Sequence, residues 1–197
     1  MKLLRFFRLG SLAMALAALV GCASTAPPSS PGNLCEIFAE KPSWHKALLE
    51  VQEKWRVPPQ IIMAMMYQES SFRHDARPPK NYLLGIIPWG RVSSAYGYPQ
   101  AKDEVWSDYL KQNDRFMASR SDFSDAVDFM GWYMDKSQKI NGVSKWDTYA
   151  QYLNYHEGWG GYSRQSHQSK TWLLNVAQKV KNRADTYGRQ YMACKPS

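Results

Sequence analysis

The chain has 197 residues, of which 44% are hydrophobic, 21% charged and 14% aromatic. This composition excludes a disordered chain, a collagen-like chain and a polytopic membrane protein, and it fits one globular domain. The formal net charge of +8 suits an acidic partner, such as an anionic membrane surface, a polymer that carries carboxylates, or nucleic acid. Charge alone does not choose among these three.

Residues 1–21 have the pattern of a secretory signal peptide. Lys2, Arg5 and Arg8 precede an apolar run from Leu9 to Val20, and this run is shorter than the roughly 20 residues of the alternative, a membrane-spanning helix. Leu19-Val20-Gly21-Cys22 resembles the lipobox of bacterial lipoproteins. That resemblance implies cleavage before Cys22 and lipidation of its thiol, and it leaves a mature chain with a charge of about +5.

The residues after Cys22 indicate where the protein resides. Ala23 stands where an Asp would favour retention in the inner membrane, so the resemblance points to the periplasmic face of the outer membrane. Residues 22–33 are rich in Ser, Thr, Pro and Gly, which predicts a flexible tether. Residues 34–197 then form one domain, which a lipid anchor on Cys22 would hold at the membrane.

Two cysteines remain in the predicted domain. Cys35 and Cys194 lie at its two ends, and two cysteines in an exported protein usually form a disulfide. The alternative is two separate buried thiols.

The hydrophobic pattern predicts an all-α fold, because apolar residues recur with a period of 3.6 and alternation with a period of 2 is not seen. Ser43 is expected to cap the first helix and Pro59 to open the second. Residues 76–100 are predicted to be a loop. Further helices are expected over 101–112, over 123–136, after a capping box at 144–147 until Gly158, and over 171–193.

Glu69 is the residue most suggestive of chemistry. On a helix it follows Met65, Met66 and Ile62 on the face that should be buried. A carboxyl in an apolar setting has a raised pKa and can act as a general acid near neutral pH. The alternative is a helix-end Glu that reaches solvent or an arginine such as Arg73.

Three short motifs in order resemble those of the lytic transglycosylases of the goose-lysozyme type, the soluble lytic transglycosylase-like family. The motifs are Glu69-Ser70-Ser71-Phe72, Gly97-Tyr98-Pro99-Gln100 and the segment from Tyr152 to Gly158. The resemblance implies a lysozyme-like helical domain with Glu69 as its catalytic residue. It also implies substrate contacts from the three motifs, by Ser70, Gly97, Tyr98, Gln100, Tyr152, Asn154, Tyr155 and Glu157.

The sequence departs from the family pattern at three places, one of which is Tyr98-Pro99, where many relatives have Leu-Met. Residues 73–96 make the stretch between the first two motifs longer than is usual in the family. In the third motif Leu153 stands where a Tyr commonly precedes the Asn, so the tyrosine that hydrogen-bonds the catalytic Glu is either Tyr152 or Tyr155.

The family resemblance implies cleavage of the β-1,4 bond between N-acetylmuramic acid and N-acetylglucosamine in peptidoglycan, with a 1,6-anhydro product. A hydrolytic muramidase on the same fold is one alternative, and an inverting hydrolase would need a second carboxylate. The candidates for it are Asp75, Asp103, Glu104 and Glu157, and for Glu157 a solvated or salt-bridged acid is the favoured interpretation. A non-catalytic peptidoglycan-binding lipoprotein is the other alternative.

The remaining patterns predict no cofactor and no metal. His156-Glu157 lacks a second His four residues after the first, so the zinc-binding helix motif is absent. Tyr98, Trp159 and Tyr162 are the rings expected in the cleft, while Trp44, Trp55, Trp132 and Trp172 are expected to pack. We expect peptidoglycan as partner, no nucleic acid, and a monomer.

Overall fold

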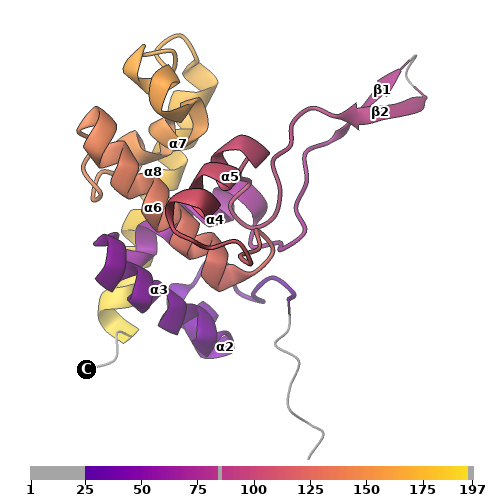
Figure 1. Ribbon diagram of the computed structural model, residues 1–197. Helices are drawn as coiled ribbons and strands as arrows, with labels where there is room; N and C mark the ends of the chain where they lie inside the picture. The colour runs from indigo at the N-terminus through magenta and orange to yellow at the C-terminus, as the bar shows by residue number, and fades with distance from the viewer. Residues whose placement is uncertain (1–24, 84–85, 195–197) are drawn as a thin grey trace, which may run out of the picture.

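The computed structural model describes residues 25–83 and 86–194, and the predicted signal peptide and Cys22 lie outside them. The described part is mostly helical, which confirms the predicted all-α class. Figure 1 shows a body of helices from which one β-hairpin extends. The elements are α2 (Leu34–Glu40), α3 (Pro42–Trp55), α4 (Pro59–Ser70), β1 (Lys80–Leu83), β2 (Ile87–Arg91), α5 (Asp103–Gln112), α6 (Phe123–Asn141), α7 (Thr148–Ser163) and α8 (Thr171–Cys194).

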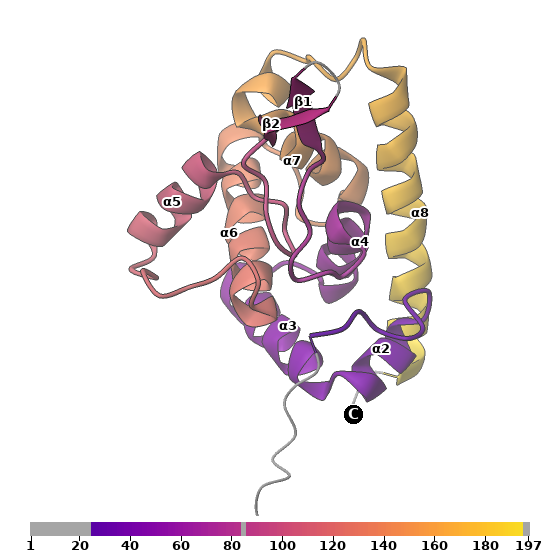
Figure 2. The ribbon, with the colours of Figure 1, turned by 90° about the vertical axis from the view of Figure 1, so that its right-hand side faces the viewer.

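Helix α4 is the central helix of the body. It contacts α3, α6 and α8, and Figure 2 shows it between α6 and α8. Every residue from Ile61 to Met66 is buried, as expected for a helix that is apolar all round. Apart from Gln60 in the first turn, its polar side chains lie in the last turn, so the fold brings Glu69 to the end of a buried helix.

Helices α3 and α4 each begin with a proline, and the sequence predicted the start of α4 correctly but not that of α3. Pro59 occupies the first position of α4, as predicted, because its missing N–H has no helical partner there. Helix α3 begins at Pro42, one residue before the predicted cap Ser43, and its cap position is Lys41. Pro42 takes the first turn for the same reason, which places Ser43 inside the helix.

A β-hairpin interrupts the segment that was predicted to be a loop. Lys80 pairs with Arg91, and Leu83 pairs with Ile87, in an antiparallel sheet of two strands. The strands were missed because they are short and lack alternation of apolar and polar residues. The hairpin points away from the helices (Figure 1).

The second half of the chain wraps the central helix with α6, α7 and α8. Asp147 caps α7 by accepting from the Ala150 N–H at 3.0 Å, so the predicted capping box at Ser144 is wrong. Gly158 breaks the helix, as predicted, with a φ of 73° that favours glycine, but helical turns resume until Ser163. Helices α6 and α8 span their predicted segments and extend beyond them, α6 by five residues and α8 by one.

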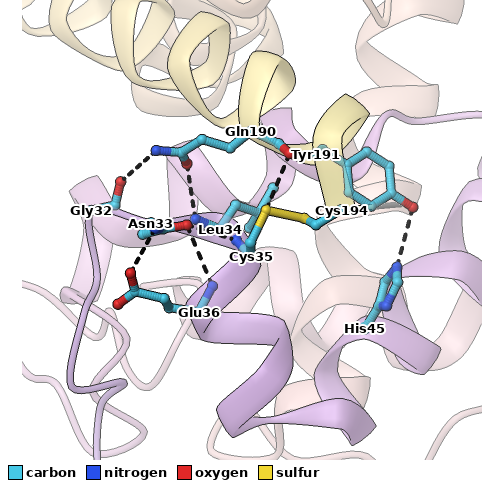
Figure 3. Close-up of a disulfide and its surroundings, with 9 residues drawn as sticks. All are labelled: Gly32, Asn33, Leu34, Cys35, Glu36, His45, Gln190, Tyr191 and Cys194. Atoms are coloured by element: carbon cyan, nitrogen blue, oxygen red, sulfur yellow. Dashed lines mark hydrogen bonds between the residues drawn. A yellow bond between two sulfur atoms is a disulfide. The ribbon is translucent and has the colours of Figure 1, made fainter. Parts of the chain in front are cut away.

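A disulfide joins the first and the last of the described helices. Cys35 in α2 and Cys194 in α8 are bonded, with their Cα atoms 5.8 Å apart, as predicted (Figure 3). Beside it, Gln190 accepts from the Leu34 N–H at 2.9 Å, and its amide nitrogen donates to Gly32 O at 3.2 Å. The bond fixes the end of α8 against the start of the domain.

The described part of the predicted tether is partly bound to this same corner. Ser29 donates its N–H and its hydroxyl to the Glu40 carboxylate at 2.9 and 2.7 Å. The Tyr187 hydroxyl of α8 donates to Pro31 O. Residues 29–33 therefore follow the body rather than leaving it directly. No helix within the described ranges is both long enough and apolar enough to cross a membrane.

Candidate active site

A cavity of about 360 Å³ lies where the end of α4 meets α6, α7 and the start of α5. Glu69 lines this cavity, together with Phe129 and Tyr133 of α6. Residues from the second motif region and from α7 complete the lining: Ala95, Gln100, Ala101, Lys102, Val105, Tyr155, His156, Glu157 and Gly158. The structure thus brings together residues from all three motifs.

The carboxyl of Glu69 has an electrostatic environment that favours its protonated form. Burial at the end of α4 raises its pKa from 4.5 to about 7, because a charged carboxylate loses hydration there. A hydrogen bond from Tyr152 lowers the pKa and partly offsets this effect. Near neutral pH the two protonation states are then comparably populated, so the group can both give and take a proton.

Two tyrosines of α7 flank this carboxyl, and the structure separates their contacts. Tyr152 is the one that hydrogen-bonds Glu69, and burial together with the negative charge of Glu69 raises the pKa of its hydroxyl. Tyr155 lines the cavity, but its hydroxyl donates to Pro99 O at 2.5 Å. One tyrosine therefore orients the carboxyl, and the other ties α7 to the second motif.

The second motif forms a tight turn that supports one wall of the cavity. Gly97 has a φ of 73°, and a Cβ there would lie 2.1 Å from Arg120 O, so no other residue fits. Gln100 lines the cavity and donates its amide N–H groups to Ala76 O and Gly97 O, both at 2.9 Å. Gly97 thus acts through the backbone, while Gln100 braces the turn from within the cavity wall.

Glu157 is the second acid of the cavity, and its oxygens are occupied. The Lys170 ammonium lies 2.8 and 2.9 Å from them, His156 Nδ1 lies 3.2 Å from Oε1, and the Ser166 hydroxyl donates to Oε2. Against the cost of desolvation, these donors lower the pKa of Glu157 from 4.5 to about 2. This carboxylate therefore stays ionised well below neutral pH.

The other candidate acids do not line the cavity. Asp103 is exposed and pairs with Arg120 at 2.7 Å. Asp75 and Glu104 are exposed as well. Of the four acids considered as a second carboxylate, only Glu157 therefore faces the same space as Glu69.

Three residues predicted to contact substrate point elsewhere. Ser70 is buried and donates its hydroxyl to Met66 O at 3.2 Å, within its own helix. The ring of Tyr98 packs at 5.7 Å from those of Trp44 and Phe123 in the core, where burial and then the charge of Asp122 raise its pKa to about 12. Asn154 is fully buried, and its amide atoms have no partner in the part of the chain that the structure describes.

The aromatic rings also differ from the sequence expectation. Trp159 stacks on Tyr133 at 4.5 Å and Tyr162 on His167 at 4.9 Å, and neither lines the cavity with Glu69. Trp44 and Trp132 are buried, as predicted, whereas Trp172 is 55% exposed. Trp159 and Tyr162 follow the third motif closely in the sequence, yet each is partly buried against another ring instead of lining this cavity.

Sequence reasoning missed the aromatic wall and the partners of Glu157. Phe129 and Tyr133 are four residues apart, so they share one face of α6, and this spacing is a signal that could have indicated a wall. Ser166 and Lys170 had no such signal, because they lie in a separate turn after α7. Among the described residues, no group of His, Cys, Asp and Glu is placed to hold a metal ion.

Comparison with known proteins gives one match that covers almost the whole chain. The sequence model of a family described as a transglycosylase SLT domain matches residues 10–194. The chain belongs to this family. Neither the curated proteins nor the solved structures gave a significant match to the SLT domain described here.

Membership in the family confirms the coarser part of the sequence prediction. An SLT domain is consistent with a glycan lyase that acts on peptidoglycan. The helical body, with a buried helix that ends in the Glu-Ser pair, is consistent with the lysozyme-like architecture expected of it.

Proposed function

We propose that the protein is a lytic transglycosylase that cleaves the MurNAc–GlcNAc β-1,4 bond of peptidoglycan and leaves 1,6-anhydro-MurNAc ends. The observation that carries the proposal is the contrast between the two cavity acids. Glu69 has a pKa of about 7, whereas Glu157 has a pKa of about 2 and all its partners in place.

In the first step Glu69 acts as the acid. Its protonated carboxyl donates to the glycosidic oxygen as the C1–O bond breaks and positive charge develops at C1. The 2-acetamido oxygen of the substrate itself stabilises that charge. Tyr152 keeps the carboxyl in one orientation, and its hydrogen bond strengthens as the carboxylate forms.

In the second step the same carboxylate acts as the base. It takes the proton of the muramic C6 hydroxyl, whose oxygen attacks C1 and closes the anhydro ring. Glu69 is protonated again at the end, so one residue completes the cycle and no cofactor takes part.

The hydrolytic alternative needs a base for water, and Glu157 is poorly suited to be one. A base whose conjugate acid has a pKa of about 2 accepts protons weakly. The oxygens of Glu157 are also already in hydrogen-bond contact with Lys170, Ser166 and His156. The non-catalytic alternative does not account for a desolvated acid held by a tyrosine at the cavity wall.

Mass spectrometry of the fragments released from purified peptidoglycan tests the reaction. The protein from residue 25 onward, which contains every described helix and the disulfide, is compared with Glu69→Gln and with Glu53→Gln, an exposed acid of α3, as control. We expect fragments lighter by one water than hydrolytic products, unchanged with Glu53→Gln and lost with Glu69→Gln. Ordinary reducing ends would indicate a hydrolase, and no release by the folded protein would indicate a binding module.

We also propose that Cys22 is lipidated and that the mature protein is an outer-membrane lipoprotein facing the periplasm, monomeric, with the domain beginning near residue 34. The lipobox-like sequence and the Ala after Cys22 support this proposal. Metabolic labelling with a palmitate analogue checks it. Cys22→Ser should abolish the label, whereas Cys35→Ser should retain it.

A further inference from the structure

The hairpin of β1 and β2 exposes apolar side chains far from the helical body. Ile86, Trp89 and Val92 are 79%, 70% and 62% exposed. The two strands pack chiefly on each other, and Figure 1 shows the hairpin projecting from the body. A lone two-stranded hairpin has little stability of its own in water, so exposed apolar residues on it indicate a partner.

The segment that carries the hairpin is also strongly basic. From residue 76 to residue 102 the sequence has Arg77, Lys80, Arg91 and Lys102 and no Asp or Glu. None of these four cations forms a salt bridge within residues 25–83 and 86–194. Arg91 donates to Pro78 O at 2.6 Å and Arg77 lies over the Tyr96 ring. Neither of these partners carries a negative charge that would offset that of the arginine.

The pairing of the strands arranges these two kinds of side chain in order along the hairpin. Lys80 pairs with Arg91 at its base. At a rise of about 3.4 Å per residue, Trp89 lies about 7 Å beyond that pair and Ile86 about 17 Å beyond it. Ile86 and Trp89 therefore lie farther out along the hairpin than Lys80 and Arg91, whereas Val92 lies beside Arg91 at the base.

We propose that this hairpin binds the surface of an anionic lipid bilayer. Ile86 enters the boundary between headgroups and acyl chains, Trp89 lies at the interface with its ring amphipathic there, and Lys80 and Arg91 contact anionic headgroups. A protein partner would bury Ile86 and Trp89 equally well, but it gives no reason for a segment that carries four cations and no acid. The proposal is independent of the reaction at Glu69.

Co-sedimentation with lipid vesicles tests the proposal. The protein from residue 25 onward lacks Cys22, so any binding comes from the folded domain. Vesicles of phosphatidylcholine alone are compared with vesicles that contain phosphatidylglycerol, at low and high salt. We expect binding only to the anionic vesicles, and weaker binding at high salt.

Matched substitutions locate the binding site. Trp89→Ala is compared with Trp146→Ala, since Trp146 is 68% exposed before α7, and Lys80→Gln is compared with Lys46→Gln in α3. We expect about fivefold weaker binding for each hairpin variant, from the loss of one interfacial ring or one cation, and little change for each control. Circular dichroism confirms that all four variants remain folded.

Three outcomes would overturn the proposal. In the first, the unchanged protein sediments with neither vesicle type at low salt. In the second, the hairpin variants and their controls weaken binding equally. In the third case, Trp89→Ala weakens binding to purified peptidoglycan and leaves vesicle binding intact, which would assign the hairpin to the glycan. Fragment release by the same proteins is measured in parallel, so that a failed membrane proposal is distinguished from an inactive enzyme.

Discussion

The two sides of the cavity each present a glutamate, and their surroundings give them opposite properties. At the end of α4, Glu69 has lost hydration and keeps one donor, Tyr152, so its pKa rises to about 7. At the kink of α7, Glu157 receives Lys170, Ser166 and His156, so its pKa falls to about 2. Residue type alone therefore does not identify the acid, and the number and charge of the donors decide it.

The largest consequence of this difference concerns turnover. Glu69→Gln removes the proton that the reaction transfers, and general acid–base groups contribute about 10²- to 10⁴-fold, so we expect a loss of that size. Glu157→Gln should retain activity within about tenfold, because it keeps the shape of the side chain. The initial rate of fragment release from peptidoglycan measures both, and a Glu157→Gln loss as large as that of Glu69→Gln would contradict the assignment.

The next consequence is that the two acids affect stability with opposite sign. The folded pKa of Glu69 lies above its unfolded value of 4.5, so the folded protein binds more protons, and stability falls as pH rises from about 4.5 to 7. At pH 8 the free energy of unfolding of Glu69→Gln should therefore exceed that of the unchanged protein by up to about 3 kcal/mol. Below pH 4 the two should not differ.

For Glu157 the folded pKa is depressed, so its contribution to stability is present above pH 4.5 and is lost as pH falls toward 2. Glu157→Gln should be destabilised at pH 7 by about 1 kcal/mol, since the Lys170 partner is partly solvated. Urea unfolding at pH 4 and pH 8 checks both variants. If both variants change the free energy of unfolding in the same direction at pH 8, the two environments do not differ as described.

The smallest expected effect is a displacement of the pH profile. With a Glu69 pKa of about 7, activity should fall as pH rises above 7, because the acid form is depleted. Tyr152→Phe removes the donor that lowers this pKa, so the falling limb should move to higher pH by up to about one unit. A rate that is lower by the same factor at every pH would instead give Tyr152 a merely structural role.

The sequence predicted the elements whose side chains follow one helical face. Helices α3, α4, α6 and α8 were expected from their apolar periodicity, and the position of Glu69 at the end of α4 followed from the spacing of Ile62 and Met65. The disulfide was predicted as well, because only two cysteines remained in the domain.

What could not be predicted depends on contacts between distant segments. Helix α2 has only seven residues, too few for a periodic signal, and the hairpin strands are held by their mutual pairing. Tyr98 was expected in the cleft, yet it packs on Trp44, which lies more than fifty residues before it in the sequence. Likewise, the choice between Tyr152 and Tyr155 was settled only by the packing of α7 on α4.

The disulfide also determines how the domain responds to mechanical load. A pull on residues 25–33 that breaks the contacts of Ser29 and Pro31 reaches Cys35, and the bond to Cys194 passes part of that force directly to α8. Helix α2 therefore cannot unfold past Cys35 under this force without displacing α8 as well. Under such a load the disulfide would hold the end of α8 against α2.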